Sequence, residues 1–462
     1  MPYTTVSGDF ERAGRLGHTN AVIRAMAERA SFYVPAEKIH DLSWLQPKIY
    51  SRSSMPVCGG RLRGVIGIDG SLQPVQVRDG LPSMYYGYAQ AAAIWLDIEA
   101  MESQRAERFV DPVVLHEAVN WALVSLDLPL AGAYLREGIS IQDSWRERID
   151  SLFRSKKIEV NRLNQSLLEL LLLLHGVPGA PAAGLPVNCV REQCGAQAVL
   201  VGAAGCDCPQ CGERLFPTDT LRIHEEVTEE GSNQVALGRL MQVIELLVLV
   251  GLTTLLWDQS RHEMMRTTLF MLDGPMAVYG PPAKLRSQAV QYFQHMVATT
   301  PGAGPYLCGI EKTGTVVDYA SALAHHDAIK PGELLTLDAD VLAVVANTKK
   351  ASTYGKETYW GRKFIYRALD GRVVVITVLP AVGAPYDDQG GQPDPAAYPS
   401  LPAILDVVDR TGSSMYRDGL IPVALAHSKA AFPIGVATDV LRLVAKQKLG
   451  LEPRDGASGG TS

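Results

Sequence analysis

The sequence predicts an α/β protein, in which short buried strands are joined by long helices. Two apolar runs, residues 65–68 and 268–272, are each followed by an Asp-Gly pair, which begins at Asp69 and at Asp273. An apolar run closed by turn residues is typical of a buried strand. Between the two runs lies a long apolar segment, residues 235–257, whose length favours a helix over a strand.

The 462 residues suggest roughly three structural units. In chain order we expect a helical arm (1–60), the first part of the core (61–98), an insertion (99–234) with a helical part (99–176) and a cysteine-rich part (187–216), the rest of the core (235–448) and a disordered tail (449–462). The core begins with three predicted strands, at 65–68, 74–77 and 83–88, whose short connections allow only an antiparallel meander. The first part of the insertion is expected to be helical because its charges lie on one face and its leucines on the other.

The second part of the core is predicted to contain the helix over 235–257 and several later elements. These are strands at 268–272 and 306–310, a hairpin formed by 363–368 and 373–379, and helices at 402–412 and 419–447. The most apolar stretch, residues 240–257, approaches the lower length limit of a membrane span. Gln242 and Glu245 interrupt it, and a carboxylate at the centre of a span costs about 2.5–3.5 kcal/mol. We therefore expect a buried core helix and no membrane insertion.

Composition excludes several classes of protein. Hydrophobic residues make up 47% of the chain, which excludes a disordered or collagen-like protein. The first 20 residues contain no apolar segment of the kind found in secretory signals, so a cytoplasmic location is expected. The sequence has no GxxxxGK[ST] motif and therefore does not hydrolyse ATP by that route.

The net charge of −6 argues at first against nucleic-acid binding. Residues 349–367, however, hold six basic side chains against one acid, with aromatic residues among them. Basic groups that neutralise phosphates and aromatic rings that stack on bases predict a single-strand track. The predicted DNA contacts are Arg362 and Lys363 in this segment, and Lys312 after strand 306–310. A solvated hairpin is the alternative.

Five of the seven cysteines lie between Cys189 and Cys211. Crowded thiols in a reducing compartment indicate metal binding. Cys189 with Cys194, and Cys208 with Cys211, form two pairs that match the four tetrahedral sulfur ligands of structural Zn²⁺. Cys206 is a fifth thiol that could replace Cys208, and free core cysteines are the alternative to a zinc site.

The two Asp-Gly pairs predict a second metal site. An aspartate at the end of a buried strand projects its carboxylate at the sheet edge, so Asp69 and Asp273 could share one or two cations. Glu245 stands alone in an apolar helix, where a carboxylate is costly unless it is paired or bound to a cation. Hard oxygen ligands suit Mg²⁺ or Mn²⁺, and two such ions can support phosphodiester cleavage. The alternatives are that both Asp-Gly pairs are structural turns and that Glu245 pairs with Arg239.

These acidic residues lie in segments that resemble the NurA nuclease family. The matching segments are Ile68-Asp69-Gly70-Ser71, the helix that carries Glu245, residues 270–280 (FMLDGPMAVYG), residues 309–313 (GIEKT) and residues 425–431 (LAHSKAA). Together they cover about residues 60–95 and 235–447, and their order and spacing make the match specific. Compact family members lack the segment between about 100 and 235, so the cysteine-rich module marks a long form whose role is not inherited.

The resemblance implies an RNase H-like fold with a central mixed sheet and a Mn²⁺- or Mg²⁺-dependent DNA nuclease. It also implies a homodimer docked on a hexameric HerA-type ATPase that moves DNA. Asp69 and Asp273 carry over as metal ligands, Glu245 or Glu263 as the acid on the helix, and His427 as the histidine beside the metals. Tyr416 is a candidate for a tyrosine near that histidine.

Two functions from different classes follow. The first is a two-metal DNA nuclease that works with a HerA-like ATPase in DNA end processing or anti-phage defence. The second is a catalytically silent nuclease fold that serves as a scaffold for the ATPase. RNA remains open as a substrate, because RNase H-type chemistry serves both nucleic acids.

Overall fold

Nine strands form one mixed sheet, and distant parts of the chain contribute to it. Their order across the sheet is β1-β13-β14-β15-β12-β11-β2-β3-β4. Their bounds are β1 Ile49–Ser51, β2 Gly64–Arg78, β3 Met84–Asp97, β4 Trp121–Ala131, β11 Thr268–Asp273, β12 Tyr306–Glu311, β13 Glu333–Thr336, β14 Arg362–Arg367 and β15 Val373–Val378. Three two-stranded sheets lie outside it, formed by β5 Lys157–Val160 with β6 Leu163–Ser166, β7 Leu185–Val187 with β8 Val199–Val201, and β9 Cys206–Asp207 with β10 Arg214–Leu215.

The computed structural model describes residues 42–55, 60–78, 83–105, 121–160, 163–258, 261–300, 304–345, 355, 357–383, 391–412, 420–432 and 436–451. Residues from Ser43 onward form one unit by their contacts. Several predictions lie outside the described residues, namely residues 1–41 of the helical arm, most of the tail, Tyr416, and Lys349, Lys350, Tyr354 and Lys356 of the basic segment.

The centre of the sheet confirms the predicted RNase H-like fold class. β2, β3 and β4 form an antiparallel meander. β11 lies parallel to β2 on its other side, and β12 lies parallel to β11. β15, β14, β13 and β1 extend the sheet as antiparallel strands. The carboxyl ends of β11 and β12 therefore meet beside the middle of β2.

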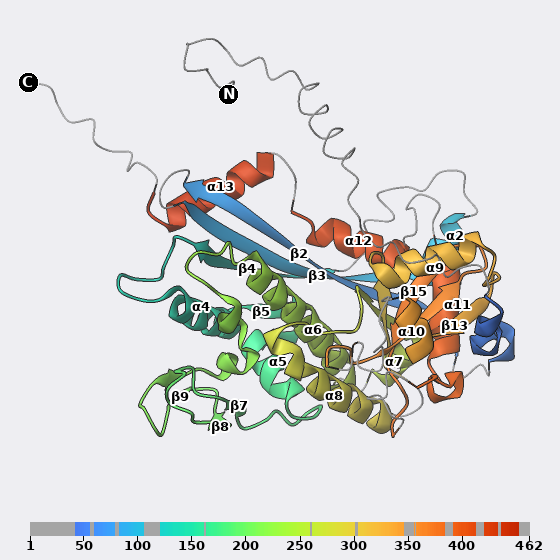
Figure 1. Cartoon of the computed structure of the whole chain (residues 1–462), viewed down its shortest axis with the longest axis horizontal. Helices are drawn as coiled ribbons and strands as arrows, with labels where there is room; N and C mark the ends of the chain where they lie inside the picture. The colour runs from blue at the N-terminus through green and yellow to red at the C-terminus, as the bar shows by residue number, and fades with distance from the viewer. Residues whose placement is uncertain are drawn as a thin grey trace, which may run out of the picture. The chain divides into compact units, whose positions relative to one another are not determined.

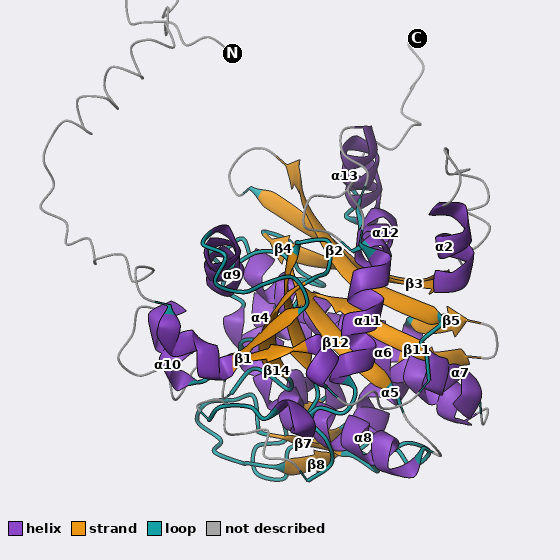
Figure 2. Cartoon of the chain, turned by 90° about the vertical axis from the view of Figure 1, so that its right-hand side faces the viewer, coloured by secondary structure: helices purple, strands orange, loops and turns teal. Residues whose placement is uncertain are grey.

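Helices cover both faces of this sheet (Figure 2). They are α2 Ile98–Arg105, α4 Ile141–Ser155, α5 Leu167–Leu174, α6 Gln234–Asp258, α7 His262–Thr267, α8 Leu285–Thr299, α9 Thr315–His325, α10 Ala339–Val345, α11 Leu401–Thr411, α12 Ile421–Ala430 and α13 Val436–Lys448. Both α6 and α12 pack against β2 and β3, and they lie on opposite sides of that strand pair (Figure 1). These two helices carry site residues, as described below.

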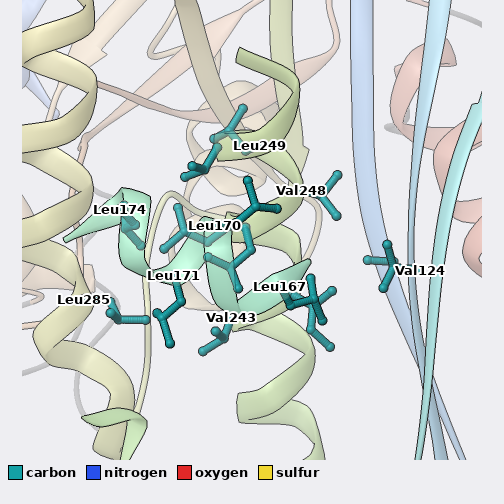
Figure 3. Close-up of a cluster of buried hydrophobic side chains, with 14 of the residues drawn as sticks. Val124, Leu167, Leu170, Leu171, Leu174, Val243, Val248, Leu249 and Leu285 are labelled. Atoms are coloured by element: carbon teal, nitrogen blue, oxygen red, sulfur yellow. The ribbon is translucent and has the colours of Figure 1, made fainter. Parts of the chain in front are cut away.

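The apolar helix α6 belongs to the largest hydrophobic core. Leucines of α5, among them Leu170 and Leu171, pack beside Val243 and Val248 of α6 (Figure 3). α6 is long and apolar enough to cross a membrane, but 78% of its most apolar window is buried inside the protein. This burial fits the prediction of a core helix.

The meander differs from its predicted form. The predicted strands 65–68 and 74–77 are one continuous strand, β2, because Asp69-Gly70-Ser71 pairs with β3 and does not turn. The third strand is β4, which lies inside the segment predicted to be helical, so the helical prediction for 99–176 is wrong there. Residues 122–126 of β4 alternate between buried and exposed, which is the strand period. The insertion therefore does not begin at residue 99, since the core still includes β4.

Two further predictions needed correction. Ile49–Ser51, within the predicted helical arm, forms the edge strand β1 against β13. The predicted helix at 419–447 is two separate helices, α12 and α13. The predicted strands at 268–272 and 306–310, the hairpin of β14 and β15, and the helix at 402–412 are confirmed within one or two residues.

Candidate active site

Two aspartates lie side by side on neighbouring parallel strands. Asp273 is the last residue of β11, and Asp69 lies on β2. The register pairs Leu272 with Ile68, so the two aspartates are the next neighbours along this ladder. Gly274 then turns the chain with a φ of 116°, a value that favours glycine, and its N–H donates to a β12 carbonyl at 2.7 Å.

Two glycines of β2 let helices approach from opposite faces. A Cβ at Gly67 would lie 2.5 Å from the carbonyl oxygen of Pro422 on α12, and a Cβ at Gly70 would lie 2.7 Å from Oε1 of Glu245 on α6. Side chains alternate along a strand, so Asp69 shares the face of Gly67 and points toward α12. Glu245 reaches the same region from the other face, through the space that Gly70 leaves open.

His427 on α12 contacts Asp69 directly, with Nδ1 2.7 Å from Oδ2. One ligand atom from each of Asp69, Asp273 and His427 lies within 4.8 Å of the others, close enough for one ion to bind all three. Asp69 is 5% exposed, whereas the His427 side chain is 61% exposed. The cluster therefore has a buried floor and an accessible rim.

Glu245, one of the two candidates for the helical acid, lies buried on α6 near Asp69 and Asp273. Burial raises the pKa of Glu245 well above its usual range, and the charges of Asp69 and Asp273 raise it further. Its carboxylate accepts a hydrogen bond from the N–H of Gly70, which acts in the other direction. The side chain of Glu263, the other candidate, is 75% exposed on α7 and pairs with Arg266.

The acids lack enough positive charge around them. Burial raises the pKa of Asp69 to about 6, and the neighbouring charge of Asp273 adds to the effect. His427 and Lys312 lower that pKa but do not cancel the shift. Carboxylates that repel one another in a partly buried site are the donor set that a hard divalent cation accepts. The residues therefore fit Mn²⁺ or Mg²⁺.

A pocket of about 630 Å³ opens beside this cluster and is lined by Asp273, His427, Lys312 and Lys363. Lys312 Nζ lies 2.7 Å from Asp273 Oδ2, and Lys363 Nζ lies 2.8 Å from Glu311 Oε1. The two predicted lysines thus line the same pocket as the acids. Whether they contact DNA stays a prediction.

Arg362 does not fit its predicted role in DNA contact. The residue is 5% exposed, and its guanidinium donates to the carbonyl oxygens of Leu337 and Gly391. The burial of β14 on both faces explains the error, because residues 362–366 are all buried and do not alternate as in a solvated hairpin. The Arg362 guanidinium therefore links the segments that contain Leu337 and Gly391 by hydrogen bonds inside the protein.

Sequence reasoning did not assign Glu311 or Tyr279 to the pocket, whereas Tyr359 is one of the aromatic residues of the predicted single-strand track. Glu311 ends β12, so the rule that singled out strand-end acids would have found it as well. Tyr279 and Tyr359 also line the pocket, and the Tyr279 hydroxyl donates to the Tyr359 hydroxyl at 2.9 Å. Tyr279 belongs to the 270–280 segment, but no spacing in the sequence pairs it with Tyr359.

The four predicted zinc ligands also converge. One sulfur from each of Cys189, Cys194, Cys208 and Cys211 lies within 4.8 Å of the others. The Cys189–Cys211 and Cys194–Cys208 sulfur separations are 3.6 and 3.5 Å. A zinc tetrahedron with Zn–S bonds of about 2.3 Å has edges of about 3.8 Å, so these positions fit Zn²⁺. Cys206 is absent from the group of converging sulfurs found among the described residues.

Local backbone geometry explains this convergence. Gly195 and Gly212 each follow a ligand cysteine with φ of 70° and 77°, which turns the chain tightly behind the sulfur. The N–H groups of Cys211 and Gln210 lower the pKa of the Cys208 thiol to about 7. The thiolate is the form of cysteine that binds metal, so Cys208 is favoured as a ligand, whereas burial raises the pKa of the Cys189 thiol to about 12.

No protein-family model and no curated protein matches this sequence. Among solved structures, the chain is similar to the NurA nuclease from Sulfolobus solfataricus, with 12% identity, a TM-score of 0.34, and coverage of 96% of this chain and 98% of that one. A second NurA structure matches with 10% identity, a TM-score of 0.29, and coverage of 87% and 91%. Both neighbours are named as NurA proteins. At these identities and TM-scores the matches carry no inference of activity, so the function proposed below rests on the residues of the site.

Proposed function

We propose that this protein is a metal-dependent deoxyribonuclease that hydrolyses phosphodiester bonds at the cluster of Asp69, Asp273 and His427. One observation carries the proposal. Asp69, Asp273 and His427 converge beside a pocket that also holds lysines, and Glu245 on α6 lies near enough for the charges of both aspartates to raise its pKa. Carboxylates bind divalent cations, and lysines attract phosphates. The site therefore contains groups that can bind a metal ion and groups that can bind the phosphate of a nucleic acid.

Asp69, Glu245 and Asp273 would hold Mn²⁺ or Mg²⁺. Two such ions supply an activated water and stabilise the leaving oxygen in this class of reaction. The protein's own groups have separate tasks. The hydrogen bond that Asp69 Oδ2 accepts from His427 Nδ1 fixes the His427 ring, so the second ring nitrogen is directed away from Asp69 and can orient the phosphate or carry a proton. Lys312 brings positive charge to the phosphate from the pocket side.

The zinc site has a structural role in this proposal. Four thiolates complete a tetrahedron and leave no position for a substrate. Arg146 on α4 joins the module to the rest of the insertion, since its guanidinium binds Asp219 at 2.9 Å and Glu213 at 3.3 Å. Zn²⁺ would hold these loops in place, away from the chemistry.

The chain would work as a cytoplasmic homodimer with a HerA-like hexameric ATPase. The sequence has no P-loop, so the energy for moving DNA must come from a partner. Such a pair could process DNA ends in repair or cut invading phage DNA. Mixing the chain with its ATPase and measuring the size of the complex tests the partnership independently of the metal site, and ATP-dependent cleavage tests the partnership and the site together.

The direct test is a Mn²⁺-dependent cleavage assay on DNA and RNA, with and without the ATPase, for the wild type, Asp69→Asn and Asp273→Asn. We expect DNA cleavage by the wild type only, with both variants still folded and still able to bind the ATPase. The rival proposal, a silent scaffold, expects no cleavage by any of the three. Preferred cleavage of RNA would change the proposed substrate from DNA to RNA. Persistent cleavage by both variants would contradict the assignment of the active site to Asp69 and Asp273.

A further inference from the structure

Two lysines each neutralise an acid at the ends of adjacent parallel strands. Lys312 pairs with Asp273, the last residue of β11, and Lys363 pairs with Glu311, the last residue of β12. The register places Asp273 beside Ile310, so the two pairs lie next to each other. Both lysines line the same pocket. They form a natural comparison, since chemistry and pairing distance are nearly equal.

The two pairs differ in how firmly they are held. The side chains of Lys363 and Glu311 are 7% and 9% exposed, and Lys363 Nζ also lies 4.3 Å from the ring centroid of Tyr359. The side chains of Lys312 and Asp273 are 31% and 15% exposed. A cation that keeps contact with water can leave its partner at low cost, whereas a buried pair that loses one member leaves an uncompensated charge.

The acid that pairs with Lys312 belongs to the proposed metal site. Asp273 is one of the three side chains whose ligand atoms converge, and Glu311 is not. A lysine ammonium and a divalent cation compete for the same carboxylate oxygens. The ammonium lies at the pocket, where a DNA phosphate would offer it another partner.

We propose that Lys312 is an exchangeable counter-ion, which neutralises Asp273 until a metal binds and then moves to a phosphate of the DNA. The inference rests on the proposed nuclease function and adds a rule of assembly to it. Metal alone must displace Lys312 from Asp273, and DNA alone must draw it away. When both are present, each favours the other, so metal and DNA bind cooperatively through this one side chain.

Reciprocity makes this cooperativity measurable without any cleavage. If DNA tightens Mn²⁺ binding by some factor, Mn²⁺ must tighten DNA binding by the same factor. Removing the Lys312 charge should therefore have opposite effects on two affinities. Mn²⁺ should bind more tightly to the protein alone, because its competitor has gone, and DNA should bind more weakly, because a phosphate partner has gone.

The experiment compares the full-length wild type with Lys312→Gln and Lys330→Gln. Lys330 is a matched control, since it pairs with Asp327 on the surface and its loss changes the net charge equally. Mn²⁺ affinity is measured by calorimetry with and without a short phosphorothioate oligonucleotide that resists cleavage. For Lys312→Gln we expect about fivefold tighter Mn²⁺ binding without DNA, the size of one partly exposed ion pair, and a smaller gain on adding DNA. Lys330→Gln should match the wild type.

Unchanged or weaker Mn²⁺ binding by Lys312→Gln overturns the inference, as does an undiminished effect of DNA on Mn²⁺ binding. An equal change in Lys330→Gln also overturns it, because the effect would then be one of net charge. Failure of the proposed function looks different, since the wild type itself would bind no Mn²⁺ at the acidic cluster and cleave no DNA.

Discussion

The acidic cluster and the cysteine cluster each bring several ligand groups from distant positions to one point. They differ in function, because the cysteine cluster is closed and the acidic cluster lies open to a pocket. The four cysteines supply identical soft ligands on tight turns, with nothing else required at the centre. The acids come from two strands and one helix, a histidine comes from a second helix, and these ligands differ in burial and lie at a pocket that contains lysines. A set of unequal ligands beside a cavity leaves room for a reactant, and a closed set of equal ligands does not.

The largest expected effect comes from removing one acid. Asp69→Asn should lower Mn²⁺-dependent DNA cleavage by at least about a hundredfold. The same change should raise the thermal stability of the metal-free protein at neutral pH, because it removes a charge that burial and Asp273 disfavour. Cleavage rate and melting temperature are measured on the same preparation. A loss of both would mean that Asp69 serves the fold and not a metal.

The stability of the protein and its affinity for Mn²⁺ should both depend on pH through Asp69. Burial raises the pKa of Asp69 from 3.8 to about 6, so the folded chain holds this proton more tightly than the unfolded chain. Its contribution to stability is fully present below about pH 4 and is lost as pH rises through about 6. Mn²⁺ must displace the proton, so its affinity should rise about tenfold per pH unit below pH 6 and level off above it. A flat profile between pH 5 and 7, in titrations followed by calorimetry, would contradict the assignment of Asp69.

A smaller effect is expected from closing the space that admits Glu245. In Gly70→Ala the new Cβ would lie 2.7 Å from Glu245 Oε1 and 2.8 Å from Met241 Cγ, so the helical acid must move. Displacing a ligand group in this way should reduce cleavage by about tenfold, with a modest loss of Mn²⁺ affinity. Gly60→Ala is the control, because its Cβ would have no atom within 4 Å. Equal cleavage activity of the two variants would contradict the proposal that Glu245 is a metal ligand.

The smallest effect on cleavage is expected at the cysteines. Cys208→Ser should lower the zinc content from about one ion per chain to near zero and the melting temperature by about 5 °C. Cleavage by the folded fraction should change less than about twofold. The measurements are metal analysis by mass spectrometry, thermal denaturation and the cleavage assay. A large loss of cleavage with an intact fold would place the cysteine module in the reaction.

The sequence allowed prediction of residues whose role depends on the local chain. Asp273 follows from its strand end and the four cysteines from their close spacing, and the structure brings each set together. Asp69 was predicted for the wrong reason, because β2 continues past it, yet it lies beside Asp273. The choices between Glu245 and Glu263, and between Cys206 and Cys208, required the fold, because both members of each pair lie near the right place in the chain. His427 came only from the family resemblance, since a histidine on a helix carries no local signal.

Long-range pairing produced the errors. β4 was missed because its hydrogen-bond partner, β3, is a separate segment of the chain, and a leucine-rich strand resembles a helix when read alone. Arg362 was placed on the surface because a cluster of basic residues reads as solvated, although carbonyl groups from two distant loops bury its charge. Neighbouring residues in the sequence do not determine which strand a given strand pairs with, or which distant segments bury a given side chain.

The most direct measurement is the anomalous scattering of a crystal of the full chain soaked in Mn²⁺. The proposal expects a manganese peak between Asp69 and Asp273, at about 2.2 Å from their carboxylate oxygens, and a separate zinc peak among the four cysteines. Manganese that binds elsewhere, with the acidic cluster empty at saturating concentration, would contradict the proposal that this cluster is the nuclease site.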